Sequence, residues 1–203
     1  MRRPSIPLRI AAAAGLLALA LVALVVREGM ARAEGQEVVL AISGFDPRAL
    51  LTGHYVQFRI TQEIAAGAPC PPGSAESEAP GAWVALRRAG SHHAASGAAA
   101  SRASALRLGE IAVMGALSCP PAPDPVVPDS SAEANLGPRS VDLDLGVDRL
   151  HVDQTRAQAI EAALRDPRAA GGPAYAVLSV GRDGRARLKG LIVAGKRTNL
   201  DWF

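Results

Sequence analysis

Large aromatic side chains are scarce in this chain of 203 residues: phenylalanine, tryptophan and tyrosine together make up 3% of it. Hydrophobic residues reach 49%, but 41 of them are alanine. Few large side chains therefore remain to build a hydrophobic core. The length fits one small domain, and two full domains would be cramped.

Cysteine is nearly absent as well, since Cys70 and Cys119 are the only two. No Cys-x-x-Cys motif exists, which excludes redox and zinc sites of that type. The two cysteines have similar settings, each after a strand-like run and each followed by two prolines. In an exported domain they can pair and close a loop of about 50 residues. Two unrelated free thiols are the alternative.

A basic domain is also missing, although the net charge is +3 and the pI is near 9.3. Residues 1–33 hold five arginines and one acid, a net charge of +4. Residues 34–203 hold 17 Lys and Arg against 18 Asp and Glu, a net charge of −1. The main domain therefore lacks the electrostatic footprint of a nucleic-acid-binding protein, and nucleic acid is not an expected partner.

One long hydrophobic run is present, from Ile10 to Val26, without a charged residue. Its 17 residues make about 25 Å of helix, the short end of a membrane span. Arg2, Arg3 and Arg9 precede it, which predicts a cytoplasmic N-terminus. We predict a basic tail at 1–9, a transmembrane helix at 10–26 in the lipid bilayer, a juxtamembrane segment at 27–36 and an exported domain at 37–203.

A cleavable signal peptide is the competing interpretation, because Ala31-Arg32-Ala33 resembles an A-x-A cleavage site. The hydrophobic run is longer than the usual core of a signal peptide, about 7–15 residues. The approach to the site is also unusually charged. Both features favour an uncleaved anchor.

The exported part alternates short strand-like runs with loops. Expected strands lie within 37–42, 55–60, 82–86, 109–117, 141–145, 150–152, 175–180 and 185–193. Residues 65–81, 91–104 and 120–138 are expected to be flexible loops, and 154–165 a helix capped by Asp153. On the last strand, Arg185, Arg187 and Lys189 are expected to face outward. We predict an α+β domain, β-rich and mainly antiparallel with one helix, behind a single transmembrane helix.

No catalytic, cofactor or metal site is predicted. A G-x-S-x-G motif is missing, and a Ser-Lys dyad would have only Lys189 and Lys196 to use. His92-His93 fits a solvated loop better than a metal site. Four aspartates lie close together in the sequence, at Asp142, Asp144, Asp148 and Asp153. They fit the polar face of a strand better than a cation site. His54, His151 and Tyr55 remain possible acid–base groups.

A turn and strand entry near residue 50 carry the most specific pattern. The turn is Asp46-Pro47-Arg48, followed by Leu50-Leu51 and by Gly53-His54-Tyr55-Val56-Gln57-Phe58-Arg59-Ile60. This segment resembles the motif of the GDYXXLXY family, with Gly53 and Tyr55 matching, His54 in place of Asp, Phe58 in place of Leu and Ile60 in place of Tyr. Gly146-Val147-Asp148-Arg149 resembles a second stretch of that family, and the hairpin from Arg182 through Gly195 is also similar.

The resemblance implies a small bacterial protein tethered to the inner membrane, with a periplasmic domain, no established activity and a multi-pass membrane protein as its possible partner. Because His54 replaces the motif's aspartate, that carboxylate is not an indispensable catalyst here. The leading hypothesis is a non-enzymatic accessory or interaction module. The alternatives are an envelope hydrolase using Asp46, His54 or Tyr55, and a periplasmic binding protein released by cleavage after Ala33.

Overall fold

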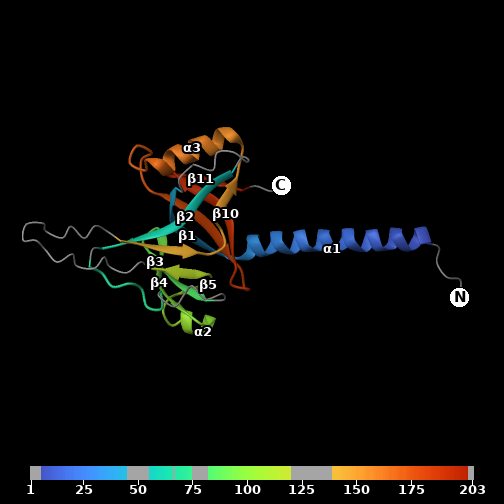
Figure 1. Cartoon of the computed structure of the whole chain (residues 1–203), viewed down its shortest axis with the longest axis horizontal. Helices are drawn as coiled ribbons and strands as arrows, with labels where there is room; N and C mark the ends of the chain where they lie inside the picture. The colour runs from blue at the N-terminus through green and yellow to red at the C-terminus, as the bar shows by residue number, and fades with distance from the viewer. Residues whose placement is uncertain (1–5, 45–54, 66, 75–81, 120–138, 201–203) are drawn as a thin grey trace, which may run out of the picture.

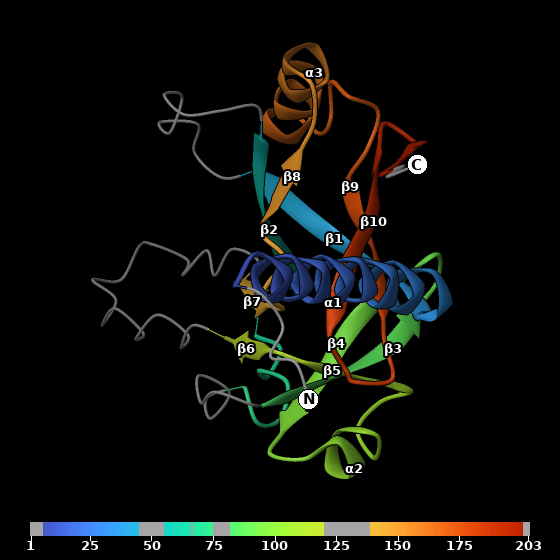
Figure 2. The ribbon, with the colours of Figure 1, turned by 90° about the vertical axis from the view of Figure 1, so that its right-hand side faces the viewer.

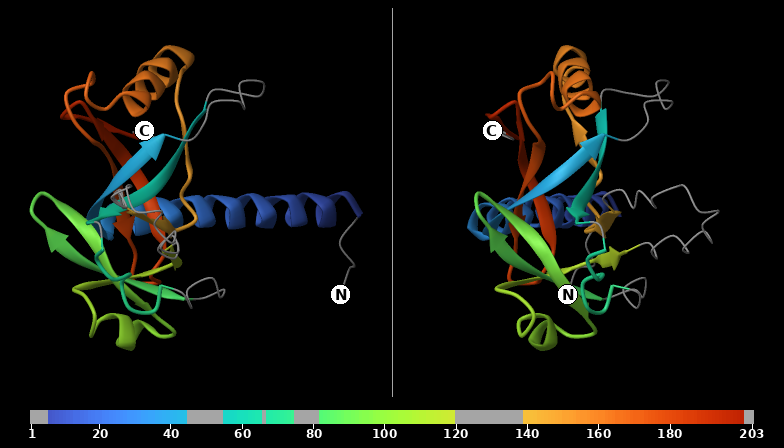
Figure 3. Two further views of the ribbon diagram at one scale, coloured as in Figure 1. Left: turned by 60° about the vertical axis from the view of Figure 1, so that its left-hand side comes forward. Right: turned by 90° about the vertical axis from the view of Figure 1, so that its left-hand side faces the viewer.

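The computed structural model describes residues 6–44, 55–65, 67–74, 82–119 and 139–200. Helix α1 (Ile6–Glu34) projects from the domain along most of its length (Figure 1, Figure 3). None of its residues is buried, so the domain leaves its apolar surface open. It is long and apolar enough to cross a membrane, and it contains the predicted span at 10–26.

Eleven strands form one β-sheet in the described part of the chain. Their bounds are β1 (Gln36–Gly44), β2 (Tyr55–Ile64), β3 (Trp83–Ala89), β4 (His92–Ala99), β5 (Ile111–Met114), β6 (Ala116–Ser118), β7 (Arg139–Asp144), β8 (Arg149–His151), β9 (Ala174–Val180), β10 (Ala186–Val193) and β11 (Lys196–Asn199). Two short helices join them, α2 (Arg102–Ala105) and α3 (Gln154–Arg165), which lie at opposite ends of the domain (Figure 2). Nearly all pairings are antiparallel, which confirms the α+β class.

The strand pairings form a closed circuit. Strand β1 pairs with β2, β2 with β7 and β7 with β6, and Gly115 alone separates β6 from β5. Strand β5 pairs with β3, β3 with β4, and β4 returns to β1 in parallel at Leu40 and His93. Strands β9, β10 and β11 extend the sheet from the other edge of β1. The circuit encloses a hydrophobic core small enough for the side chains of these short strands to fill.

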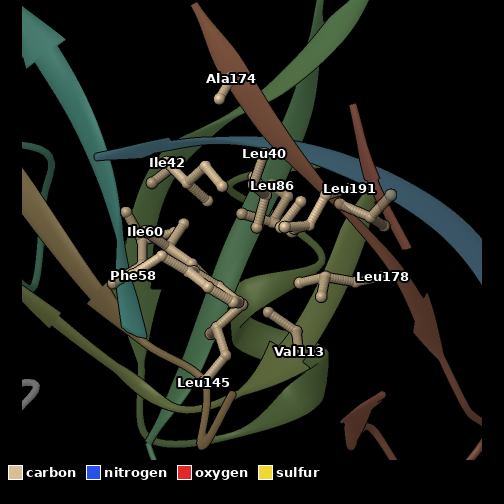
Figure 4. Packing of buried hydrophobic residues seen from close by; sticks show 14 of the residues in the cluster. Leu40, Ile42, Phe58, Ile60, Leu86, Val113, Leu145, Ala174, Leu178 and Leu191 are labelled. Atoms are coloured by element: carbon tan, nitrogen blue, oxygen red, sulfur yellow. The ribbon is translucent and has the colours of Figure 1, made fainter. Parts of the chain in front are cut away.

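Alternating side chains build that core, as the period of two along each strand requires. On β1, Val38, Leu40 and Ile42 are buried, and Phe58 on β2 is only 1% exposed. Figure 4 shows Leu40, Phe58, Leu86 and Val113 pointing toward one another from four strands. Medium-sized aliphatic side chains thus fill a core that has few aromatics.

Helix α3 has the bounds that the sequence predicts. Asp153 caps it, with a side-chain oxygen accepting the Arg156 N–H at 3.0 Å. Its buried face consists of Ala157, Ile160 and Leu164, which pack beside β1, β2 and β10. At Gly44 an added Cβ would lie 3.1 Å from the Cβ of Leu164, so the end of β1 approaches the helix closely.

Three expectations were wrong. Residues 91–104 are not a flexible loop, because 92–99 form β4 and 102–105 form α2. The alanines of β4 pack against neighbouring strands. Hydrogen bonding to β3 and β1 makes this segment a strand, which its hydrophobic periodicity does not predict. The run 109–117 divides at Gly115, where a Cβ would lie 2.4 Å from the Asp144 carbonyl oxygen. Arg187 does not face solvent, as described below. The sequence also gave no signal for β11.

A disulfide joins Cys70 to Cys119, with their Cα atoms 6.0 Å apart. It holds residues 67–74 against the sheet, where the Pro72 carbonyl accepts the Ala98 N–H at 2.8 Å. Arg139 reinforces this segment by donating to the Ala68 carbonyl. The segment therefore covers part of the edge of β4, which would otherwise leave unpaired backbone groups exposed.

Candidate functional site at the helix–sheet junction

The described motif residues lie where two strands pair. Asp46, Pro47, Arg48, Gly53 and His54 lie outside the described residues. Tyr55 begins β2 with its Cα opposite that of His151 on β8, and Gln57 lies opposite Arg149. The Phe58 N–H donates to the Asp148 carbonyl at 3.0 Å. The two sequence stretches that resemble the family motif therefore meet in space as the β2–β8 pair.

The structure gives these motif residues local structural roles. Phe58 is a core residue. Gly146 has φ +70°, a conformation that favours glycine, and its N–H donates to the Asp144 Oδ1 at 3.0 Å. Arg149 forms an exposed ion pair with Asp148 at 3.1 Å. Their geometry specifies the turn before β8.

The other candidate groups from the sequence are dispersed. His92 lies against the Tyr175 ring, with centroids 5.5 Å apart, whereas His93 Nδ1 accepts the Val39 N–H at 3.2 Å. Asp144 and Asp153 accept backbone N–H groups at separate sites. Lys189 pairs with Glu37. Among the described residues, no three His, Cys, Asp or Glu side chains are grouped to hold a metal ion.

The most organised polar arrangement lies instead where α1 enters the sheet. Gly35 alone separates α1 from β1. A Cβ on Gly35 would lie 2.0 Å from Ser179 Oγ and 2.9 Å from the Val180 carbonyl oxygen. Arg32, in the last turn of α1, donates from Nη2 to the Leu200 carbonyl at 2.9 Å. The end of the helix is therefore packed against β9 and the chain after β11.

Arg187 on β10 forms the second connection between helix and domain. Its guanidinium donates to Glu28 Oε2 at 3.1 Å and to Asp183 Oδ2 at 2.9 Å. These carboxylates leave the Arg187 side chain only 12% exposed. The Arg187 hydrogen bond lowers the pKa of Asp183 to about 2 and the carboxylates raise the pKa of Arg187. A charge predicted to face solvent is thus enclosed by a carboxylate from α1.

A second ionic cluster joins three strands of the sheet extension. Glu37 on β1 accepts from Arg197 on β11 at 2.8 Å and from Lys189 on β10 at 3.2 Å. The Arg197 hydrogen bond, followed by that of Lys189, lowers the pKa of Glu37 to about 2. These bonds fasten β10 and β11 to the first residues of β1.

Two hollows adjoin these clusters. One, of about 420 Å³, lies beside α1 and is lined by Leu24, Arg27, Glu28, Met114, Asp183, Arg185 and Arg187. The other is an open groove of about 760 Å³ between α3 and the β10–β11 turn. Alanines from α3 line much of the groove, with Arg156, Asp166 and Lys196 among its polar residues.

Sequence reasoning missed this junction. Glu28 and Arg187 are 159 residues apart, and no local period relates them. The sequence signal for the junction was the group of charged residues between the apolar run and Ala33, namely Arg27, Glu28 and Arg32. Of these charges, Glu28 and Arg32 have partners in the folded domain.

Comparison with known proteins gives one finding about ancestry. A family model described as GDYXXLXY protein matches residues 17–191, which include the second half of α1 and most of the sheet. No curated protein and no solved structure matched the chain.

Proposed function

The chain belongs to the GDYXXLXY family, and on that basis we propose that it is a single-pass protein of a bacterial inner membrane, a non-enzymatic interaction module with a periplasmic domain. Helix α1 is the anchor, with the N-terminus in the cytoplasm. The domain acts beside a membrane partner, which we propose to be a multi-pass protein.

The observation that carries this proposal is the junction between anchor and domain. Gly35 is the only residue between α1 and β1, and Arg32 and Glu28 both bind groups of the sheet. A helix attached in this way holds its domain in one orientation at the bilayer surface. Such an attachment suits a module that recognises a neighbour in the same membrane.

The junction also supports retention of the N-terminal segment. Cleavage after Ala33 would remove Glu28 and Arg32 and expose the guanidinium of Arg187. A signal peptide has no need of contacts with the mature domain. The disulfide supports an oxidising compartment, because such bonds rarely persist in the cytosol.

Purification of the tagged full chain at native expression in a mild detergent tests the proposal. We expect one multi-pass membrane protein to co-purify in fixed stoichiometry. We also expect the intact mass to be that of the whole 20.9 kDa chain. Extraction of the membranes at alkaline pH should leave the protein with the lipid.

Three results would contradict parts of the proposal. Purification of the chain alone would reject the partner. A mass lacking residues 1–33 would favour the released binding protein. Hydrolytic activity lost in both Asp46→Asn and His54→Ala variants would favour the envelope hydrolase, whose proposed residues 46 and 54 lie outside the described part of the chain.

A further inference from the structure

We propose that the 420 Å³ hollow beside α1 binds the phosphate headgroup of an anionic phospholipid in the membrane that α1 spans. This inference rests on the proposed anchoring of α1. It assigns a ligand class to a site that the motif of the family does not include.

The position of the hollow comes from the register of the sheet. Val180, the last residue of β9, lies opposite Gln36, the first residue of β1. The turn that follows, residues 181–185, therefore extends past the start of β1 and back along α1. Its neighbours there include Leu24, within the apolar run, and Arg27, directly after it. The hollow thus spans the boundary between apolar and polar parts of the anchor.

The turn is held firmly in this place. The Gly184 carbonyl accepts the Met114 N–H at 2.8 Å, and the Arg182 carbonyl accepts from Arg102 at 3.1 Å. Gly184 has φ +78°, and a Cβ there would lie 2.3 Å from the Trp83 ring. A rigid wall reduces the entropy that a ligand loses on binding.

The charges of the hollow favour an anion. Its lining carries Arg27, Arg185 and Arg187 against Glu28 and Asp183, a net charge of +1. Both carboxylates bind Arg187. No ion pair among the described residues involves the guanidinium of Arg27 or that of Arg185. Arg185 does attract Glu28 and Asp183 electrostatically and, after the hydrogen bonds of Arg187, lowers the pKa of both. Because no ion pair in the described part of the chain holds either arginine, both can donate to a phosphate, which guanidinium groups bind with paired hydrogen bonds.

The apolar lining identifies a lipid as the source of that phosphate. Leu24 and Met114 line the same hollow as the arginines. A phospholipid presents a phosphate and glycerol next to acyl chains, in the order in which the hollow presents arginine and apolar side chains. The volume lies within the range of small-ligand sites, about 300–1,000 Å³. A free phosphate would leave the apolar wall unused.

Native mass spectrometry of the full chain, with added phosphatidylglycerol or phosphatidylcholine, tests this site. We expect the wild type to bind phosphatidylglycerol in preference. Each arginine near an anionic lipid contributes about fivefold in affinity, so R27Q/R185Q should lose about 25-fold. R185K, which keeps the charge and loses the planar fork, should be intermediate.

The matched control is R165Q/R168Q, which removes two exposed arginines. Arg165 ends α3 and Arg168 follows it, and this end of α3 and the segment after it lie away from α1 (Figure 1, Figure 3). The affinity of this control variant for phosphatidylglycerol should stay within about twofold of wild type. Circular dichroism of every variant should match the wild type, because the altered side chains are exposed.

Equal binding of the two lipids, or equal phosphatidylglycerol affinity in wild type and R27Q/R185Q, would overturn the proposal. Full displacement of the lipid by millimolar inorganic phosphate would reject the lipid as the source of the anion. Release of the protein at alkaline pH would reject the anchor itself. A protein retained in the membrane without lipid preference would reject the lipid site alone.

Discussion

His93 shows at the scale of one residue how the circuit of strands is closed. Strands β1 and β4 meet in parallel only at Leu40 and His93. There His93 Nδ1 accepts the Val39 N–H at 3.2 Å. Near it, Gln62 Oε1 accepts the Ala95 N–H at 2.6 Å. Where β1 and β4 meet, two side chains thus provide hydrogen-bond acceptors that backbone carbonyls would supply in a longer strand pairing.

Replacing His93 by leucine should destabilise the full chain by about 1–3 kcal/mol, because the Val39 N–H loses its acceptor in a partly buried place. Burial lowers the pKa of His93, so the unfolded chain takes up a proton more readily. Wild-type stability should therefore fall as the pH drops below about 6.5, and the H93L variant should lack that decline.

Urea unfolding of the full chain in detergent between pH 5 and pH 8 measures both effects. His92→Leu is the matched control, because neighbouring residues of a strand point to opposite faces and His92 contacts the Tyr175 ring instead. The role assigned to His93 is wrong if H92L and H93L have the same stability and the same pH dependence.

At the scale of elements, an ionic cluster adds to the backbone pairing that joins β10 and β11 to β1 through β9. Glu37 binds Arg197 and Lys189, and its pKa falls from 4.5 to about 2. The carboxylate is about two-fifths exposed, so water screens the attraction. Because the folded pKa is the lower one, this stabilisation is complete above about pH 4.5 and is lost as the pH falls toward 2.

Glu37→Gln should cost about 1 kcal/mol or less at neutral pH and should flatten the loss of stability between pH 4.5 and 2. Thermal unfolding across that interval measures the difference. Glu63→Gln, which changes an exposed carboxylate on β2, should leave the pH profile as in wild type. An unchanged profile in E37Q would show that the cluster does not stabilise the fold.

Gly35 decides how closely helix α1 approaches the sheet. A Cβ at this position would overlap Ser179 Oγ, a buried atom without a hydrogen-bond partner among the described residues. Gly35→Ala should therefore destabilise the full chain by about 1–3 kcal/mol. Adding Ser179→Ala should recover part of that loss.

Gly29→Ala is the matched control, since no atom lies within 4 Å of a Cβ there and alanine favours a helix. Its stability should equal or exceed that of wild type. Thermal unfolding in detergent micelles compares the variants. A G35A protein as stable as G29A would mean that the helix end is not packed against β9.

For the whole molecule, the disulfide is a covalent constraint between segments far apart in the sequence. It joins residues 49 apart and holds 67–74 over the edge of β4. Closing such a loop contributes about 4 kcal/mol in the chain-entropy model. The sequence places both cysteines after strand-like runs, and the closed circuit brings those runs together.

Replacing both cysteines by serine should lower the free energy of unfolding by about 4 kcal/mol. Hydrogen exchange at Ala98 should also accelerate, because its N–H donates to Pro72 in the segment that the disulfide holds. Exchange at Leu178, in the centre of β9, serves as the internal control. Equal protection of Ala98 in both proteins would contradict the role given to this segment.

The sequence by itself determined the long apolar N-terminal helix, the β-rich class of the domain, the capped α3 helix and the β9–β10 hairpin. These features depend on local patterns: an uncharged run, alternation, and a turn at Arg182-Asp183-Gly184. Only the tertiary structure decided that residues 92–99 form the strand β4, that β11 pairs with β10, and that Glu28 helps to bury Arg187. Those contacts join residues far apart in the chain. Short alanine-rich segments show no hydrophobic periodicity that would predict a strand. The sequence around a charged residue is also the same whether water or a distant carboxylate surrounds its side chain.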